Sequence, residues 1–225
     1  MNYVIETKDV KKIYNLGKSS EVHALNGVNL KIKEGELVAI MGPSGSGKTT
    51  LLDTLGCILK PTYGKIFIDG LETEKLTEEQ LAEVRGKKIG FIFQQYNLIH
   101  SFTAMENVAF AIRILGMPKD TAEKKAKKLL SLVGLGKRFD HRPSELSGGE
   151  QQRVAIARAL SNDPKIILGD EITGNLDTKT SKIILNLIKQ LNKENNYTIV
   201  LITHDPRIGD YCDRLIKIQD GKILE

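Results

Sequence analysis

The chain has 225 residues, of which 40% are hydrophobic and 27% are charged, with a net charge of +5. This length allows one large domain, or a compact core with an inserted subdomain. No apolar run approaches the roughly 18 residues of a membrane-spanning helix, and the N-terminus lacks the apolar core of a signal peptide. We therefore expect a cytoplasmic protein that meets a membrane only through a partner or its surface.

Cysteine usage and charge give weaker signals. The two cysteines, Cys57 and Cys212, lie far apart and without metal-ligand spacing, which fits a reducing compartment. Basic residues concentrate in 119–128 and 136–142. These stretches form either a solvated helical face or a patch for nucleic acid or an anionic membrane. No aromatic residues interleave with the lysines, which argues against nucleic acid.

In chain order, the N-terminal third shows strand signals. Residues 28–42 predict two strands around a turn at Glu34-Gly35, 64–70 a short strand ending in Asp-Gly, and 87–93 a buried strand. Residues 102–162 carry apolar residues at helical spacing, interrupted by Pro118 and Gly134–Gly136, and predict a helical insertion. Strand 165–168, amphipathic helix 179–194, strand 197–203 and hairpin 214–224 follow. This alternation predicts a parallel α/β core.

Residues 42–49, GPSGSGKT, match the P-loop pattern G-x-x-x-x-G-K-[ST] completely. The match follows the apolar strand LVAIM and precedes a helical run over 49–59, which is the setting that the pattern needs. Its glycines allow backbone N–H groups to point at phosphate oxygens, and the helix start adds positive charge. The alternative is a glycine-rich turn without a ligand. The predicted phosphate-binding residues are Gly42, Pro43, Ser44, Gly45, Ser46, Gly47, Lys48, Thr49 and Thr50.

The apolar run 166–168 leads to two adjacent carboxylates, Asp170 and Glu171. A polar turn after a strand is the simple interpretation. In P-loop proteins, however, a carboxylate at the end of a neighbouring strand helps to hold Mg²⁺, together with the P-loop hydroxyl. Asp170 suits that role with Thr49. Glu171 is one residue further along and points elsewhere, where it would polarise the water that attacks the γ-phosphate.

Residues 146–153, LSGGEQQR, extend the pattern, and with them the chain resembles the nucleotide-binding subunits of ABC transporters over nearly its full length. The motifs GPSGSGKT, FQQ, LSGGEQQR, IILGDE and TH also follow one another in the family's order. The resemblance implies an α/β fold: a RecA-like P-loop NTPase core with an N-terminal antiparallel β subdomain and an inserted helical subdomain. We expect a single domain over 1–225, with the β subdomain and P-loop part in 1–95, the helical part in 96–160 and the remaining core in 161–225.

The resemblance also implies roles for further residues. Tyr14 would stack on adenine, although it could be an ordinary strand aromatic. Gln94 would contact Mg²⁺ and the attacking water, and would link the core to the helical insertion. His204 would bind the γ-phosphate, and Asp177 belongs to a loop that crosses between subunits. The signature would bind ATP held by a second subunit, although Ser147 could be only a helix cap; its residues are Ser147, Gly148, Gly149 and Glu150.

The implied protein is an ATPase with cofactors ATP and Mg²⁺. Its catalytic residues would be Lys48, Gln94, Glu171 and His204, and its metal ligands Thr49, Gln94 and Asp170. Two copies would close around two ATP–Mg²⁺ and push on membrane-embedded permease subunits, at the inner face of the membrane. The stretches FQQYNLIHSFTAMENV and DE-TGNLD resemble the branch that serves lipoprotein release, macrolide and peptide export, and related mechanotransmission systems. Ile172 stands where the family usually has proline, which leaves the positioning of the 174–177 loop open.

Three alternatives stay open at this point. A soluble ABC ATPase that acts on nucleic acid or ribosomes usually has paired cassettes or long insertions, and 225 residues leave no room for them. A regulatory module that holds ATP without turnover would lack the base, yet Glu171 is present. A GTPase would need an N-K-x-D motif, and NKEN at 192–195 lacks the aspartate.

Overall fold

The structure is a computed structural model that describes residues 3–224. A six-stranded sheet lies at its centre, in the order β10 (Lys222–Leu224), β9 (Arg214–Gln219), β3 (Leu37–Met41), β8 (Thr198–Thr203), β7 (Ile166–Asp170) and β6 (Ile89–Ile92). All neighbouring pairs are parallel except the β9–β10 hairpin. The predicted parallel α/β core and the C-terminal hairpin are therefore confirmed.

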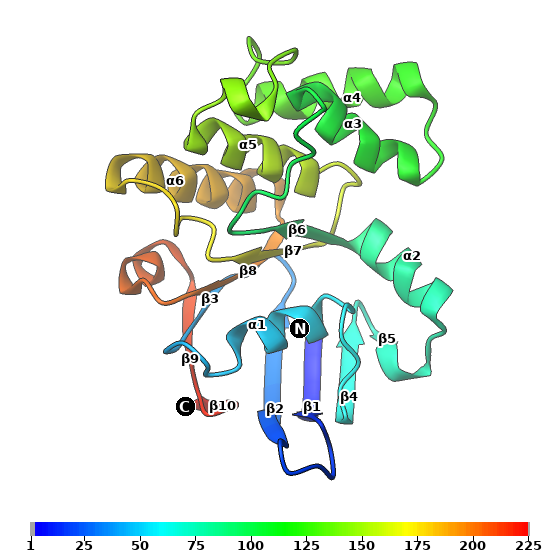
Figure 1. Ribbon diagram of the computed structural model, residues 1–225, viewed down its shortest axis with the longest axis vertical. Helices are drawn as coiled ribbons and strands as arrows, with labels where there is room; N and C mark the ends of the chain where they lie inside the picture. Colours follow the sequence, from blue (N-terminus) through cyan, green and yellow to red (C-terminus); the bar gives the residue numbers. More distant parts are fainter. Residues whose placement is uncertain (1–2, 225) are drawn as a thin grey trace.

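A second, antiparallel sheet forms the lower part of Figure 1, in the order β2 (Val22–Lys33), β1 (Tyr3–Tyr14), β4 (Tyr63–Ile68) and β5 (Leu71–Glu72). The two strands predicted around Glu34-Gly35 are β2 and β3, but they belong to different sheets. The turn between them carries the chain from one sheet to the other.

Helices cover both faces of the central sheet. Helix α1 (Lys48–Leu55) packs on one face together with the antiparallel sheet, and α3 (Ala104–Ile114), α4 (Lys119–Leu132), α5 (Gly148–Ala159) and α6 (Thr178–Asn195) lie on the other (Figure 1). Strand β3 supplies alternate residues to the two faces, Leu37 and Ala39 to one core and Val38 and Ile40 to the other. Strands buried on both faces read as continuous apolar runs, as 37–41 and 198–203 do.

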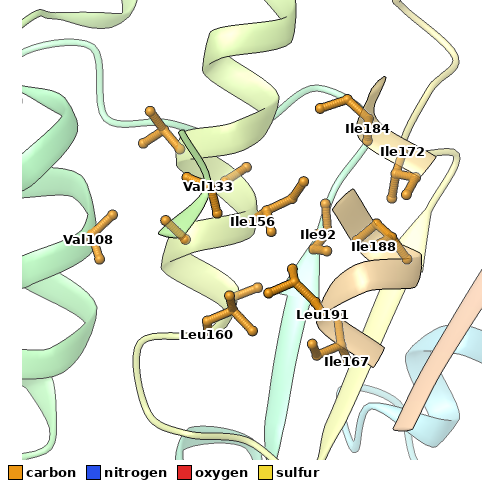
Figure 2. Packing of buried hydrophobic residues seen from close by; sticks show 14 of the residues in the cluster. Ile92, Val108, Val133, Ile156, Leu160, Ile167, Ile172, Ile184, Ile188 and Leu191 are labelled. Carbon is orange, nitrogen blue, oxygen red and sulfur yellow. The ribbon is translucent and has the colours of Figure 1, made fainter. Parts of the chain in front are cut away.

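The larger core lies under the helical insertion. Figure 2 shows Ile92 and Ile167 of the sheet meeting Ile156 of α5, Leu160 at the end of that helix, and Ile188 of α6. Three of the helices that contribute to this core begin at polar caps, namely Thr103 before α3, Ser147 before α5 and Asp177 before α6. Within residues 3–224, no helix combines the length and the apolar character that crossing a bilayer requires.

Two local predictions were wrong in their bounds, and one helix was not predicted. The helix expected over 49–59 ends at Leu55, because Gly56 follows it and Cys57 takes a left-handed backbone with φ of 56°. The strand expected over 87–93 begins only at Ile89, since the two preceding lysines end helix α2 (Glu78–Lys88). That helix was not predicted; it buries only Leu81 and Val84, so it has almost no apolar periodicity. Short 3₁₀ turns occupy Thr73–Lys75, Pro143–Glu145 and Pro206–Tyr211.

Candidate functional site

The predicted motifs meet at the carboxyl edge of the central sheet. In the parallel register Met41 lies beside Thr203, Ile202 beside Asp170, and Gly169 beside Ile92. The chain leaves these strands at Gly42, His204, Glu171 and Phe93 respectively, so the four segments emerge side by side. Ligands of open α/β sheets bind at this edge.

The P-loop has the local geometry of an anion cradle. Gly45 and Gly47 have φ of 78° and 97°, values that a residue with a Cβ rarely adopts, and a Cβ on Gly47 would lie 2.3 Å from the Ala24 carbonyl oxygen. Helix α1 begins directly after Gly47, and no side chain caps its first turn. Its first N–H groups therefore remain available to an anion.

Lys48 and Ser46 complete the cradle. The Lys48 side chain is buried, and its ammonium donates 2.8 Å hydrogen bonds to the carbonyl oxygens of Gly42 and Pro43. The loop thus encloses its own cation. The Ser46 hydroxyl is buried and has no hydrogen-bond partner within residues 3–224. A buried hydroxyl without a partner in a loop that wraps around a cation fits a phosphate-binding role.

Asp170 interacts electrostatically with two other carboxylates and with Lys48. Burial raises the pKa of Asp170 above its ordinary value, and the charges of Glu171 and Asp53 raise it further, while Lys48 opposes the shift. Burial also raises the pKa of Asp53. A buried carboxylate whose nearest charges are mostly negative is stabilised by a cation.

Asp53 was missed by the sequence analysis. It lies one helical turn after Thr49 on α1, so the two residues share a face of the helix. That spacing is the only sequence signal that could have found it.

Glu171 and His204 lie together although 33 residues separate them in the chain. His204 Nδ1 is 2.8 Å from Glu171 Oε1. Glu171 has a left-handed backbone with φ of 42°, which few residues with a Cβ adopt, and its N–H donates to the Ile202 carbonyl oxygen. Ile172 is buried in the larger core. Ile172 thus anchors the chain in this core directly after the strained acid.

Gln94 follows β6 at the same edge. Its carbonyl oxygen accepts a 3.0 Å hydrogen bond from the Asn175 amide, and a Cβ on Gly174 would lie 2.9 Å from its side-chain nitrogen. Gln94 is thereby in contact with the loop that follows Glu171. Two residues later the chain enters an unusual turn at Tyr96 and Asn97, whose carbonyl oxygens both accept hydrogen bonds from Arg158.

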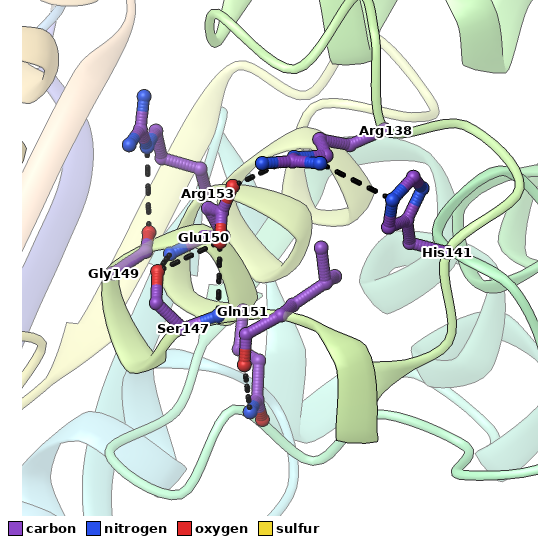
Figure 3. A network of polar contacts seen from close by, with 8 residues as sticks. Arg138, His141, Ser147, Gly149, Glu150, Gln151 and Arg153 are labelled. Carbon is purple, nitrogen blue, oxygen red and sulfur yellow. Dashed lines mark hydrogen bonds and ion pairs between the residues drawn. The ribbon is translucent and has the colours of Figure 1, made fainter.

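Ser147 caps helix α5 through a reciprocal capping box (Figure 3). Its hydroxyl accepts from the Glu150 N–H and donates to Glu150 Oε2, and the Ser147 N–H donates to the same oxygen at 2.9 Å. Arg138 contacts both Glu150, at 3.0 Å, and His141. The hydrogen bonds from Ser147, with a smaller contribution from Arg138, hold the pKa of Glu150 below its ordinary value.

The structure does not bring the signature and the P-loop of one chain together. Helix α5 packs on the face of the sheet opposite to α1 (Figure 1). Gly148 lies against Tyr96 and Leu176, and Gly149 against Thr180. The signature therefore contacts the segments that follow Gln94 and Glu171, and the phosphate contact expected of it from the sequence would need a second chain.

Asp177 and Tyr14 occupy peripheral positions. Asp177 caps α6 by accepting from the N–H groups of Lys179 and Thr180, and bonds from Thr180 lower its pKa. Tyr14 ends β1, is 38% exposed, and has the Lys12 ammonium 5.5 Å from its ring centre. It pairs with Val22 on β2, two residues before the Ala24 carbonyl that touches the P-loop. An exposed aromatic beside the cradle suits a nucleobase.

Three oxygen donors suit a magnesium ion here: the Thr49 hydroxyl, the Asp170 carboxylate and the Gln94 side-chain carbonyl. Residues 3–224 contain no cluster of three histidine, cysteine or acidic side chains that could hold a metal by themselves. Magnesium ordinarily binds one or two carboxylates and takes its other ligands from water and substrate phosphates. The residues present at this edge fit such an ion.

Comparison with known proteins agrees with this geometry. Residues 25–174 match the ABC transporter family model. An uncharacterized ABC transporter ATP-binding protein of Thermotoga maritima is 52% identical over 99% of this chain and 94% of its own length. The lipoprotein-releasing system ATP-binding protein LolD 1 of Rhodopseudomonas palustris is 43% identical over 98% of both chains. The macrolide export ATP-binding/permease protein MacB of Syntrophobacter fumaroxidans is 46% identical, and the match covers 98% of this chain but 31% of MacB.

Among solved structures, the dimeric post-hydrolysis state of the ATP-binding cassette MJ0796, bound to ADP and Pi, superposes with a TM-score of 0.89. It is 45% identical, with 98% of this chain and 97% of that chain covered. MJ0796 is an ABC transporter ATP-binding protein of Methanocaldococcus jannaschii. The predicted RecA-like P-loop fold and the resemblance to the LolD and MacB branch are thus confirmed. The chain belongs to the ATP-binding subunits of ABC transporters, a family of ATPases.

Proposed function

We propose that this subunit binds ATP with Mg²⁺, dimerises around two nucleotides, and drives a membrane-embedded permease of the lipoprotein-release or macrolide-export type. The observation that carries this proposal is the meeting of four motif segments at one sheet edge, while the signature lies on the opposite side of the sheet. A site that a single chain leaves incomplete requires a second copy. The dimeric structure of MJ0796 supports this arrangement.

Each residue of the edge has a task in the proposed reaction. The P-loop N–H groups and Lys48 hold the phosphates. Thr49, Asp170 and Gln94 would hold the metal ion, which when bound would neutralise charge on the phosphate oxygens. Glu171 orients the attacking water and accepts its proton. His204 hydrogen-bonds the γ-phosphate, Tyr14 stacks on adenine, and Ser147, Gly148, Gly149 and Glu150 form the facing site on the second copy. Asp177 lies in the loop that crosses between the copies.

The pairing of His204 with Glu171 has a consequence for this scheme. In the free chain, Glu171 Oε1 is held by the imidazole at 2.8 Å. This contact uses Nδ1, so the opposite ring nitrogen, Nε2, is the one that would hydrogen-bond the γ-phosphate. In this scheme the imidazole orients the Glu171 carboxylate while it contacts the substrate.

A groove beside β6 is the proposed contact for the permease. It has a volume of about 300 Å³ and includes Arg85, Phe91, Phe93, Asn97 and Arg158 in its lining. It lies between α2 and the helical residues 96–160, which we propose as the unit that moves against the core of 1–95 and 161–225. The groove includes residues on either side of Gln94, so a movement of Gln94 at the nucleotide site would change the shape of the groove. We place the subunit at the inner face of the membrane through this contact, without a nucleic-acid partner.

The test of the nucleotide reaction is Glu171→Gln. This change keeps the shape of the side chain and removes the base, so ATP binding should persist while hydrolysis falls about 10²–10⁴-fold. An ATP-bound dimer should then survive size-exclusion chromatography. Glu194→Gln, an exposed change on α6, is the matched control. Normal hydrolysis by Glu171→Gln would show that the base is wrongly assigned.

The proposed branch has a separate test. The gene next to this one should encode a permease with a large extracytoplasmic domain, and co-expression of the two should give a complex that is recovered from membranes. A neighbouring permease without such a domain would argue against the lipoprotein-release and macrolide-export type.

A further inference from the structure

The backbone just after Gln94 is strained. Tyr96 and Asn97 are consecutive and have φ of 59° and 49°, both in the left-handed region. Asparagine tolerates this region, whereas a bulky side chain such as tyrosine rarely enters it. A local turn is formed by the Asn97 N–H, which donates to the Gln95 carbonyl oxygen at 2.6 Å. Strained residues of this kind persist only where their surroundings hold them.

Arg158, in the last turn of α5, holds this turn. Its Nη2 donates to the Tyr96 carbonyl oxygen at 2.7 Å, and its Nη1 donates to the Asn97 carbonyl oxygen. The planar guanidinium suits two neighbouring carbonyls, as a lysine ammonium would not. Within residues 3–224, no acidic side chain forms an ion pair with Arg158. In this part of the chain its guanidinium therefore hydrogen-bonds the two backbone carbonyl groups alone.

The same helix contacts the turn at its other end. A Cβ on Gly148 would lie 3.0 Å from the Tyr96 hydroxyl, so the tyrosine side chain reaches the first residue of α5. The start of helix α5 thus contacts the Tyr96 side chain, and Arg158 near the end of the helix contacts the Tyr96 carbonyl oxygen. Helix α5, which has Ser147 at its N-cap, is therefore in contact at both of its ends with the turn that follows Gln94.

We propose that Arg158 is a positioning residue for hydrolysis: by holding the Tyr96–Asn97 backbone it fixes the place of Gln94, and it connects that place to the groove beside β6. Arg158 and Asn97 both line the groove, so an occupant of the groove meets the clamp directly. The inference rests on the proposed role of Gln94 at the γ-phosphate. The inference adds that helix α5 and the groove act on Gln94 through the hydrogen bonds between Arg158 and the Tyr96–Asn97 backbone.

The first experiment compares Arg158→Gln with Arg113→Gln, a change of an exposed arginine on α3. Hydrogen exchange of peptides covering 94–98 is measured without nucleotide, and steady-state ATP hydrolysis is measured in parallel. Arg158→Gln should exchange about ten-fold faster in these peptides, with kcat about ten-fold lower and KM within about two-fold of the wild type. Arg113→Gln should leave both unchanged. An Arg158→Gln protein that keeps normal exchange and normal kcat would overturn the proposal.

The second experiment changes only the backbone preference of the exposed residue 97. Asn97→Val disfavours the left-handed conformation and should reproduce the loss of kcat with Arg158 in place. Asn97→Gly favours that conformation and should restore at least about a third of the lost kcat to Arg158→Gln. If Asn97→Val hydrolyses normally, or Asn97→Gly restores nothing, the clamp does not position Gln94.

Failure of the proposed function is separately visible. A wild-type protein that does not hydrolyse ATP would refute that function, and the nucleotide-free exchange data would still show whether Arg158 holds the turn.

Discussion

The buried side chain of Gln152 lowers the free energy of unfolding of this protein. Its side chain is 0% exposed, and neither its amide nitrogen nor its amide oxygen has a hydrogen-bond partner within residues 3–224. The neighbouring Gln151 differs, since its amide nitrogen donates to the Leu146 carbonyl oxygen at 3.0 Å. Of two adjacent glutamines on one helix, one side chain is hydrogen-bonded and the other is not. Changing each to methionine measures how much this difference contributes to the free energy of unfolding.

Gln152→Met should stabilise the protein. Each unsatisfied buried polar group costs about 1–3 kcal/mol, and this amide has a donor and an acceptor. Methionine has a similar length and similar helix propensity, so the change removes the polar atoms without creating a large cavity. We expect the free energy of unfolding to rise by about 2 kcal/mol. For a chain of this size that corresponds to a Tm increase of about 4–8 °C.

The assay is urea unfolding followed by circular dichroism, with thermal unfolding alongside it. Gln151→Met is the matched control, and because it removes a made hydrogen bond it should lower the free energy of unfolding by about 1 kcal/mol. Opposite signs for the two variants would support the reasoning. If Gln152→Met instead unfolds more easily than the wild type, the Gln152 amide has a partner in solution and the inferred cost does not exist.

Three further predictions follow from contacts described above. Lys48→Ala should abolish nucleotide-dependent dimerisation in a size-exclusion assay, and unchanged ATP affinity would contradict the cradle. The pKa of Glu150 is lowered in the folded chain, so its stabilising contribution is present above its ordinary value of 4.5 and lost as pH falls through the folded value. Acid unfolding of Glu150→Gln should accordingly show a weaker pH dependence in that window than the wild type. Burial raises the pKa of Cys57 to about 11 and of Cys212 to about 12, so both thiols should react with a disulfide reagent at pH 8 far more slowly in the folded than in the unfolded protein.

The parts of the site that could be predicted from the sequence are those formed by residues that are contiguous in the chain. The P-loop, the two acids at the end of β7 and the start of α5 each combine a local pattern with a neighbouring strand or helix, so pattern and physical reason coincide. The parallel register follows from the alternation of strands and helices. It was sufficient to place Gly42, Glu171 and His204 at one edge.

Contacts between residues that are far apart in the chain could not be predicted from the sequence. Arg158 and Tyr96 are 62 residues apart, and nothing in either local stretch indicates that a guanidinium will meet two carbonyls. The pairing of His204 with Glu171 likewise depends on the register of β7 and β8. Helix α2 escaped prediction for a different reason, because a helix with two buried side chains leaves almost no apolar pattern.

Strands β6 and β7 are neighbours in the sheet, yet residues 93–165 separate them along the chain. A connection between parallel neighbours needs only a dozen or so residues. Most of this excursion is therefore not needed to close the sheet. The stretch between the Tyr96–Asn97 turn and Ser147 can change in length and surface while Gln94 and the start of α5 keep their places. One cassette architecture can in this way present different outer surfaces to different neighbours.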